Sequence, residues 1–448
     1  MKEKKRRQDL LNGNIREQLL LFFFPIMFGS IIQQLYNTVD AIVLGNAVGK
    51  EALGAVGGST GTFINLLFGF TIGVTSGSTV VISQAYGKGN QEEVEKGVYS
   101  GMALAVGLGS ILMVIAWIIA PTLLLKLNVP DAIYPFSLLY LRIFLLGCIP
   151  LVIYNTGASI LRAVGDSKRP LYFLAVACIT NIILDILFVV VFHLGISGAA
   201  FATVIAQIVS CCLTLYTLQH VDNSYRFDAR NFHVDWPTLK RILTIGLPIG
   251  IQSALYSFSN LFIQSSVNTY GTNTVAAYTA FGTIDALFWN TSGALGASVL
   301  TFVGQNYGAG NIKRVKQGMW NGIGLYVAMS LMISGICYFT GNTLYHLFTP
   351  DIEVIEIGVG LLRFLCPYWI LFCFVEIFSQ GMRACGASIV PAFITVSAIG
   401  IFRIVWIFFY PAENVFETLV CYPISWAASS TLFLIYYISG KWLKLKKD

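Results

Sequence analysis

The sequence has little charge: 11% of its 448 residues are Asp, Glu, Lys or Arg, whereas 56% are hydrophobic. A water-soluble domain needs more charge on its surface, so that class is excluded. The nine cysteines show no CxxC or histidine-paired spacing, and almost all lie within apolar segments, where they are expected as small apolar residues. The four histidines are not paired either. The sequence therefore predicts no disulfide framework, no metal centre and no cofactor.

A nucleotide-binding loop is also missing. The segment GNAVGKE at 45–51 has three residues between its glycines where a phosphate loop has four, and Glu51 stands where that loop has Ser or Thr. No arrangement of nucleophile, metal ligands or cofactor-binding residues takes its place. Neither an ATP-driven pump nor an enzyme is predicted.

Long apolar segments are what the sequence has in abundance. About a dozen of them have the roughly 20 residues that a helix needs to cross a bilayer. The first follows a basic stretch at 2–7, but it is longer than the apolar part of a signal peptide and is predicted to stay as a span. The spans are predicted near 17–42, 52–82, 95–120, 133–157, 170–192, 196–218, 240–268, 275–301, 316–340, 353–379, 389–410 and 415–439. The predicted fold class is an all-α polytopic membrane protein with 12 transmembrane helices.

The positive charges predict the orientation. With a cytoplasmic N-terminus, 23 of the 28 Lys and Arg residues fall on the cytoplasmic side and two on the opposite side. Such a bias places both termini inside. We expect cytoplasmic tails at 1–16 and 440–448, in a multi-pass protein of the cell inner (cytoplasmic) membrane.

An internal repeat divides the chain into two halves. SQAYGKGN at 83–90 and GQNYGAGN at 304–311 agree in five of eight positions, and LRAVGDSKRP at 161–170 and MRACGASIVP at 382–391 agree in five of ten, both at an offset of 221 residues. Each half has six spans, so the two enter the membrane from the same side and form parallel lobes about an axis along the membrane normal. We predict lobes at 17–218 and 240–439, joined by a cytoplasmic linker at 219–239.

Acidic residues within the first lobe are the strongest functional candidates, because ionisable groups in a membrane are costly and usually functional. Asp40 shares one helix face with Gln33, Tyr36 and Asn37. Asp185 has a similar depth in the fifth span, with Asn181 one turn before it, and Thr203 lies at that depth in the sixth. The set predicts a cation-coupling site of Asp40, Asn181, Asp185 and Thr203, which could exchange a proton or bind Na⁺ through hard oxygen ligands. The alternative is a polar network that only fixes helix packing.

Further polar residues predict a substrate-binding cleft, and two prolines predict hinges. The proposed cleft residues are Gln33, Tyr36, Asn37, Asn155, Gln252, Tyr256, Asn260, Asp285 and Glu376. Asp285 could instead form a structural ion pair with Arg403. Pro25 and Pro248 interrupt the helical hydrogen-bond ladder at equivalent places in the first and seventh spans. Gly69, Gly73 and Gly77 repeat at four-residue spacing, which lets another backbone approach closely.

Taken over its whole length, the sequence resembles the multidrug and toxic compound extrusion (MATE) family. The resemblance rests on the span count, the repeat, the prolines of spans 1 and 7, QLYNTVDAIVLG at 34–45, and the paired QAYGKGN and QNYGAGN turns. It implies an antiporter that exports organic, often cationic compounds in exchange for H⁺ or Na⁺, with a cation site at Asp40, Asn181, Asp185 and Thr203. Small drug-like substrates, contact with lipid, no nucleic acid and a monomer are expected.

Two other functions stay open at this point. Lipid-linked oligosaccharide flippases of the same superfamily share the repeat, although they tend to line the cleft with basic residues, and only three arginines lie within spans here. A receptor or scaffold without transport is the third hypothesis.

Overall fold

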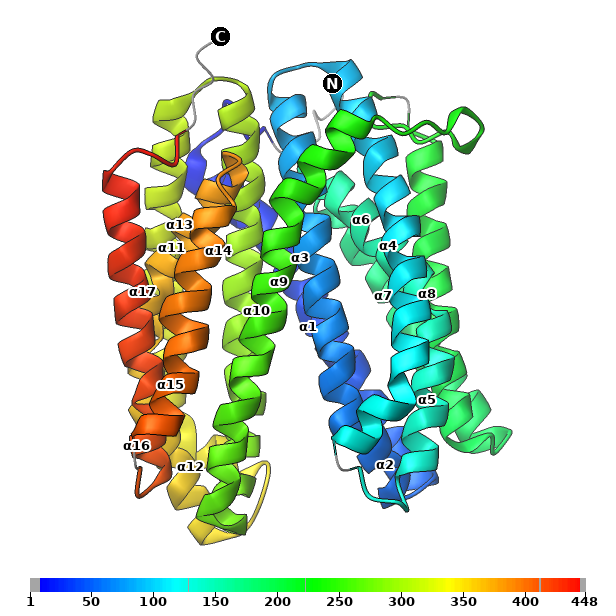
Figure 1. Cartoon of the computed structure of the whole chain (residues 1–448), viewed down its shortest axis with the longest axis vertical. Coiled ribbons are helices and arrows are strands. Elements are labelled where there is room, and N and C mark those ends of the chain that lie inside the picture. The colour runs from blue at the N-terminus through cyan, green and yellow to red at the C-terminus, as the bar shows by residue number, and fades with distance from the viewer. Residues whose placement is uncertain (1–8, 128, 222, 411, 444–448) are drawn as a thin grey trace, which may run out of the picture. The chain divides into compact units, whose positions relative to one another are not determined.

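The computed structural model describes residues 9–127, 129–221, 223–410 and 412–443, and in these ranges all regular structure is helical (Figure 1). Eleven helices are long and apolar enough to span a membrane, and a bent pair brings the number to 12. The predicted all-α polytopic fold is therefore confirmed. The outer parts of the two predicted tails lie outside the described residues.

The first half of the chain contains eight α-helices and a π-helical segment: α1 (Ile15–Ala47), α2 (Lys50–Gly57), α3 (Ser59–Gly87), α4 (Gln91–Lys126), α5 (Tyr134–Leu146), α6 (Cys148–Ala163), α7 (Lys168–Asp185), η1 (Ile186–Val191) and α8 (Gly195–Gln219). The linker adds the short η2 (Ala229–Asn231). The second half has α9 (Trp236–Val267), η3 (Asn268–Tyr270), α10 (Thr272–Gly308), α11 (Ile312–His346), α12 (Ile352–Leu365), η4 (Cys366–Phe372), α13 (Cys373–Ala384), α14 (Ile389–Thr395), η5 (Val396–Ile401), α15 (Phe402–Phe409), α16 (Val415–Leu419) and α17 (Cys421–Ile438).

Contacts divide the chain into two compact units, but not quite at the predicted lobe boundaries. Unit 1 holds residues 24–250, and unit 2 holds 251–448 together with the early segment 9–23. That segment is bound within unit 2, because the Leu10 carbonyl accepts hydrogen bonds from Asn306 at 3.0 Å and from Arg314. The chain thus passes from one unit to the other next to Pro25 in α1 and next to Pro248 in α9.

The repeated turns have the same local geometry in both halves. Gly89 has a φ of 73° and Gly310 a φ of 74°, a region that disfavours side chains with a Cβ. The following residues, Asn90 and Asn311, cap α4 and α11, each accepting a hydrogen bond at 3.1 Å from the backbone N–H three residues later. The sequence GN therefore ends one helix and starts the next in each lobe.

A pair of cation–π contacts repeats as well. The Arg142 guanidinium lies 4.9 Å from the ring centre of Trp117, and Arg363 lies 5.7 Å from that of Tyr338. Arg363 follows Arg142 by 221 residues, and Tyr338 follows Trp117 by the same number, which is the repeat offset. An aromatic face stabilises an arginine that would otherwise face apolar surroundings. These two arginines are therefore scaffold residues.

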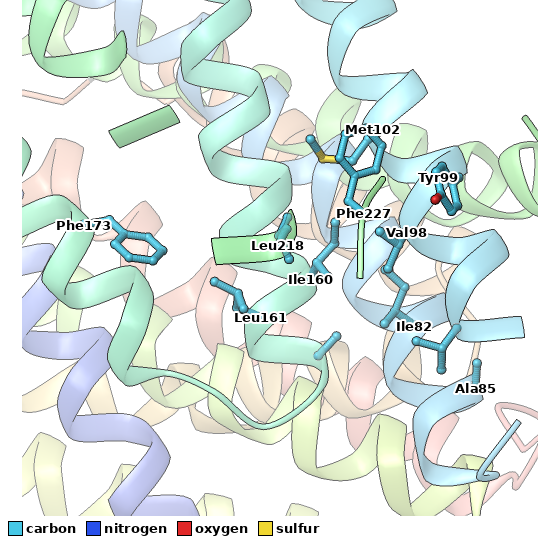
Figure 2. Packing of buried hydrophobic residues seen from close by; sticks show 12 residues of the cluster. Ile82, Ala85, Val98, Tyr99, Met102, Ile160, Leu161, Phe173, Leu218 and Phe227 are labelled. Atoms are coloured by element: carbon cyan, nitrogen blue, oxygen red, sulfur yellow. The ribbon is translucent and has the colours of Figure 1, made fainter. Parts of the chain in front are cut away.

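The interior of unit 1 contains a hydrophobic cluster contributed by α3, α4, α6, α7, α8 and the linker (Figure 2). Tyr99 of α4 links the linker to this cluster, since its ring lies 5.4 Å from that of Phe227. Its hydroxyl accepts a hydrogen bond at 3.1 Å from the Asp228 backbone N–H. The linker is thereby anchored on unit 1.

Local departures from straight helices occur at several places where the sequence predicted continuous spans, including the π-helical η5 in the eleventh span. The fourth span bends by 50° between α5 and α6, at Gly147, where the missing side chain leaves room for the carboxamide of Gln207. The fifth span changes to a π-helix immediately after Asp185. Such π segments are frequent at functional sites.

Candidate functional site

Three helices of unit 1 bring the four predicted cation-coupling residues together. Asp40 comes from α1, Asn181 and Asp185 from α7, and Thr203 from α8. Their exposed fractions are 5%, 0%, 0% and 3%. Two carboxyl groups, an amide and a hydroxyl are thus buried in one place, as the helical spacing and depth of these residues predicted.

The two acids contact each other directly. Their carboxyl groups lie within hydrogen-bonding reach. With its amide nitrogen facing them, Asn181 donates to Asp40 Oδ1 at 2.8 Å and to Asp185 Oδ2 at 3.3 Å. Two ionised carboxylates repel each other in a medium of low dielectric constant, so such a contact requires a proton or another cation between them.

Two polar atoms of this cluster have no hydrogen-bond partner among the described residues: Asp185 Oδ1 and Thr203 Oγ1. Buried polar atoms are normally paired, so two orphans at one place indicate room for a cation or water. Tyr36 and Tyr140 lie next to Thr203. Tyr140 was not among the sequence candidates, because its single polar atom within an apolar span gives no signal that distinguishes it from core tyrosines.

A cavity of about 60 Å³ has Tyr36 in its lining, and Tyr36 interacts electrostatically with both acids. It is lined by three of the predicted cleft residues, Gln33, Tyr36 and Asn155, whereas the exposed Asn37 is not part of its lining. This volume suits water or an ion, since pockets for drug-sized ligands measure about 300–1,000 Å³. The sequence missed other lining residues, among them Tyr154 and Cys178.

In unit 2, two of the predicted cleft residues join a different polar cluster. Arg383 donates to Gln252 Oε1 at 2.5 Å. Gln380 donates to Glu376 Oε1 at 3.0 Å, and Glu376 and Arg383 interact electrostatically. Gln252 and Glu376 therefore belong to one network, and their role as cleft residues remains a prediction.

The alternative of an ion pair between Asp285 and Arg403 was wrong. Asp285 accepts hydrogen bonds from the indoles of Trp289 at 2.8 Å and Trp369 at 3.2 Å. Within the part of the chain that the structure describes, no salt bridge joins Asp285 to Arg403.

Arg403 instead has partners that include the two remaining predicted residues. It donates to Asn260 Oδ1 at 3.3 Å and to Ser425 Oγ at 3.2 Å. Its guanidinium also lies 5.4 Å from the ring centre of Tyr256. Tyr256 and Asn260 therefore surround a buried cation.

Comparison with known proteins bears on what these sites serve. The family model MatE matches the chain twice, at residues 25–187 and 248–409, so each match begins at one of the two predicted hinge prolines. The chain belongs to the MATE family. The resemblance noted from the sequence is thereby confirmed, and family members are transporters rather than enzymes.

Relatives and solved structures agree with this membership. A probable multidrug resistance protein of Bacillus subtilis, YpnP, is 28% identical over 98% of each chain. A second one from the same organism, YoeA, is 30% identical over 95% of this chain and 94% of the relative. The outward-facing structure of a multidrug resistance MATE family transporter matches the fold with a TM-score of 0.90 at 22% identity, over 98% of this chain and 99% of that one. This MATE protein is an integral multi-pass membrane protein with multidrug transporters as homologues.

The position of Asn181 leads to a prediction. Asn181→Ala removes the donor that bridges both acids, and a hydrogen bond to a charged group is worth about 1.5–3 kcal/mol. We expect a roughly tenfold slower gradient-driven efflux and a lower Tm. Ile179→Ala, which truncates an exposed side chain of the same helix, is the control and should leave the efflux rate unchanged. Equal efflux by both variants would contradict a role for the bridging amide.

Proposed function

We propose that this MATE protein is a secondary active antiporter that exports organic, often cationic compounds in exchange for an external cation. The observation that carries the proposal is the direct contact between two buried carboxyl groups, Asp40 and Asp185. A contact of this kind is stable only while a positive charge is bound to it. Exchange of ions with the two sides of a membrane can supply and remove that charge.

The arrangement favours H⁺ over Na⁺ as the coupling ion. Asn181 can donate to both acids only with its amide nitrogen directed at them. That orientation turns its amide oxygen, the atom that would bind Na⁺, away from the acids. Two carboxyl groups in contact can share a proton without further ligands. Na⁺ would need several oxygen atoms directed at one point.

The cycle follows from this chemistry. The two acids in contact share one proton and carry one negative charge. A second proton from outside neutralises the pair, and its release inside restores a negative charge that attracts an organic cation. Proton and substrate thus compete for the negative charge of the two acids. A membrane potential of 100 mV contributes about 2.3 kcal/mol per net charge moved inward, a factor of roughly fifty in accumulation. It therefore contributes only when more positive charge enters than leaves.

Pro25 and Pro248 are proposed as the hinges of alternating access. Both lie inside helices of more than 30 residues, and the change from one compact unit to the other falls at 23–24 and 250–251. Since proline removes a backbone hydrogen bond, each helix bends most readily there. We also propose that both termini are cytoplasmic and that the protein lies in the inner membrane. The transporting form is proposed to be a monomer. The relatives named above do not specifically support the flippase alternative.

The decisive measurement is efflux of a fluorescent organic cation from proteoliposomes under separately imposed gradients. We expect a proton gradient to accelerate efflux at least tenfold over liposomes without protein, and a sodium gradient of equal size to have no effect. Acceleration by sodium alone would overturn the choice of ion. No acceleration by either gradient would overturn the antiport.

A further inference from the structure

Unit 2 contains a buried cation for which the described residues provide no salt bridge. Arg403 of α15 has an exposed fraction of 0%. Its Nε and Nη1 atoms donate to Ser425 and Asn260, both uncharged. Because the neighbouring Asp285 is held by two indoles, the charge of Arg403 is not balanced by a contact ion pair. Asp285 compensates the charge only through an electrostatic interaction without direct contact. A buried charge without a contact ion pair is costly, and a protein retains it when it has a use.

Aromatic rings hold the guanidinium in place. Its central carbon lies 4.0 Å from the ring centre of Tyr422, 5.4 Å from that of Tyr256 and 6.0 Å from that of Trp426. Cation–π contacts stabilise the charge but do not satisfy its N–H groups. The rings therefore fix the orientation of Arg403 and leave its donor atoms to other partners.

Two donors at this place lack an acceptor. Within the described residues, Arg403 Nη2 and Trp426 Nε1 are buried and have no hydrogen-bond partner. Both are N–H groups that can only donate. A ligand that satisfies them must supply acceptor atoms, and a guanidinium prefers a planar group with two oxygens.

The repeat gives this arrangement a counterpart in unit 1. Asn260 of α9 corresponds to Asn37 of α1 at the offset of 223 residues that separates the two family matches, and Tyr256 corresponds to Gln33. The first helix of each lobe thus borders a buried charge, although Asn37 itself is exposed. In unit 1 that charge belongs to acids, whereas in unit 2 it belongs to an arginine.

We propose that Arg403 forms an anion-binding site within unit 2 that takes the carboxylate of a small organic molecule. Arg403 Nη2 and Trp426 Nε1 are the donors, while Asn260, Ser425 and the rings of Tyr256 and Tyr422 position the guanidinium. The inference rests on the proposed transport function in one respect: it extends the substrates from cations to zwitterions and carboxylates. Binding itself needs no gradient.

The test is a binding measurement on the purified full-length protein in detergent, in a chloride-free buffer. Benzoate, the neutral benzamide and chloride are titrated separately by calorimetry. We expect benzoate to bind at least tenfold more tightly than benzamide or chloride. Equal affinities for benzoate and benzamide, or tighter binding of chloride than of benzoate, would overturn the proposal without any variant.

Variants then locate the site. Arg403→Gln should weaken benzoate binding at least tenfold, and Arg403→Lys, which keeps the charge but loses the planar fork, should have a smaller effect. Trp426→Phe should weaken it a few-fold. Arg363→Gln removes an equal charge elsewhere in unit 2 and should leave benzoate affinity unchanged. If Arg403→Gln does not fold, the benzoate affinities of Arg403→Lys and Trp426→Phe test the site. Wild-type benzoate affinity in both variants would refute it.

This design separates the inference from the proposed function. Benzoate binding that is intact in a protein without gradient-driven efflux would contradict only the antiport. Efflux of an organic cation driven by protons, together with no preference for benzoate, would contradict only the anion site.

Discussion

Asp40→Asn is expected to reduce gradient-driven efflux to the rate of liposomes without protein. The substitution keeps the size of the side chain and its ability to form hydrogen bonds, but the amide cannot take up or release a proton. Because Asp40 is buried against Asp185 and Asn181, no bulk water or neighbouring exposed acid can replace it. Efflux of a fluorescent cation from proteoliposomes, with the protein amount matched, measures the effect.

The matched control is Asp131→Asn, the same chemical change at an exposed position after α4. We expect this variant to transport like the wild type. The Asp40 variant must also elute as a single species with a Tm close to that of the wild type, so that loss of efflux is not loss of fold. Wild-type efflux by folded Asp40→Asn would refute the assignment of the coupling charge to this residue.

Gly77→Val is expected to abolish production of folded protein. Within unit 1, helix α3 packs backbone against backbone on α9, and the contacts run from Gly73 and Gly77 to 242–250. A Cβ at Gly73 would lie 2.6 Å from the Gly250 Cα, and one at Gly77 would collide with the Ile242 carbonyl. Overpacking against movable side chains costs about 1–3 kcal/mol, and a main-chain neighbour can yield less than a side chain.

Gly107→Val tests whether a valine in a transmembrane helix is harmful by itself. A Cβ at Gly107 in α4 meets no heavy atom within 4 Å, so this variant should be obtained in wild-type yield. Yield and monodispersity on size-exclusion chromatography are the measurements, with Gly77→Ala as an intermediate case of lowered Tm. Normal yield and Tm of Gly77→Val would show that the two helices do not need this close approach.

Hydrophobic segments and the repeat made most of the scaffold predictable. Bilayer thickness determines how long a span must be, so apolar segments near 17–42 or 389–410 could be placed within a few residues of α1 and of the α14–α15 span. The paired GN turns were also predictable, because a glycine with positive φ followed by an asparagine cap has a recognisable sequence. The bend at Gly147 was not predictable, since it depends on Gln207, which lies 60 residues away in the chain.

For the candidate site, helical spacing and membrane depth were sufficient to predict which polar residues meet in unit 1. They were insufficient to predict this in unit 2. Polar residues are rare in a span, so Asp40 and Asp185 had few alternative partners at the same depth. Asp285 and Arg403 met the same criterion of depth, yet the structure separates them. Opposite charges at one depth attract, but Trp289 and Trp369 hold the carboxylate, and the position of an indole N–H depends on side-chain packing that no sequence pattern records.

The sequence by itself determined the membrane, the number of spans, the repeat and the concentration of acids in the first half, because each follows from composition or from spacing along one helix. Only the tertiary structure decided which side chains meet: Asn181 between the two acids, and Arg403 among aromatic rings, with no salt bridge in the described part of the chain. The physical reason is that lipid constrains each span separately, through its length and polarity. Hydrogen bonds between spans depend on the rotation of each helix about its axis, which is set by contacts between residues far apart in the chain.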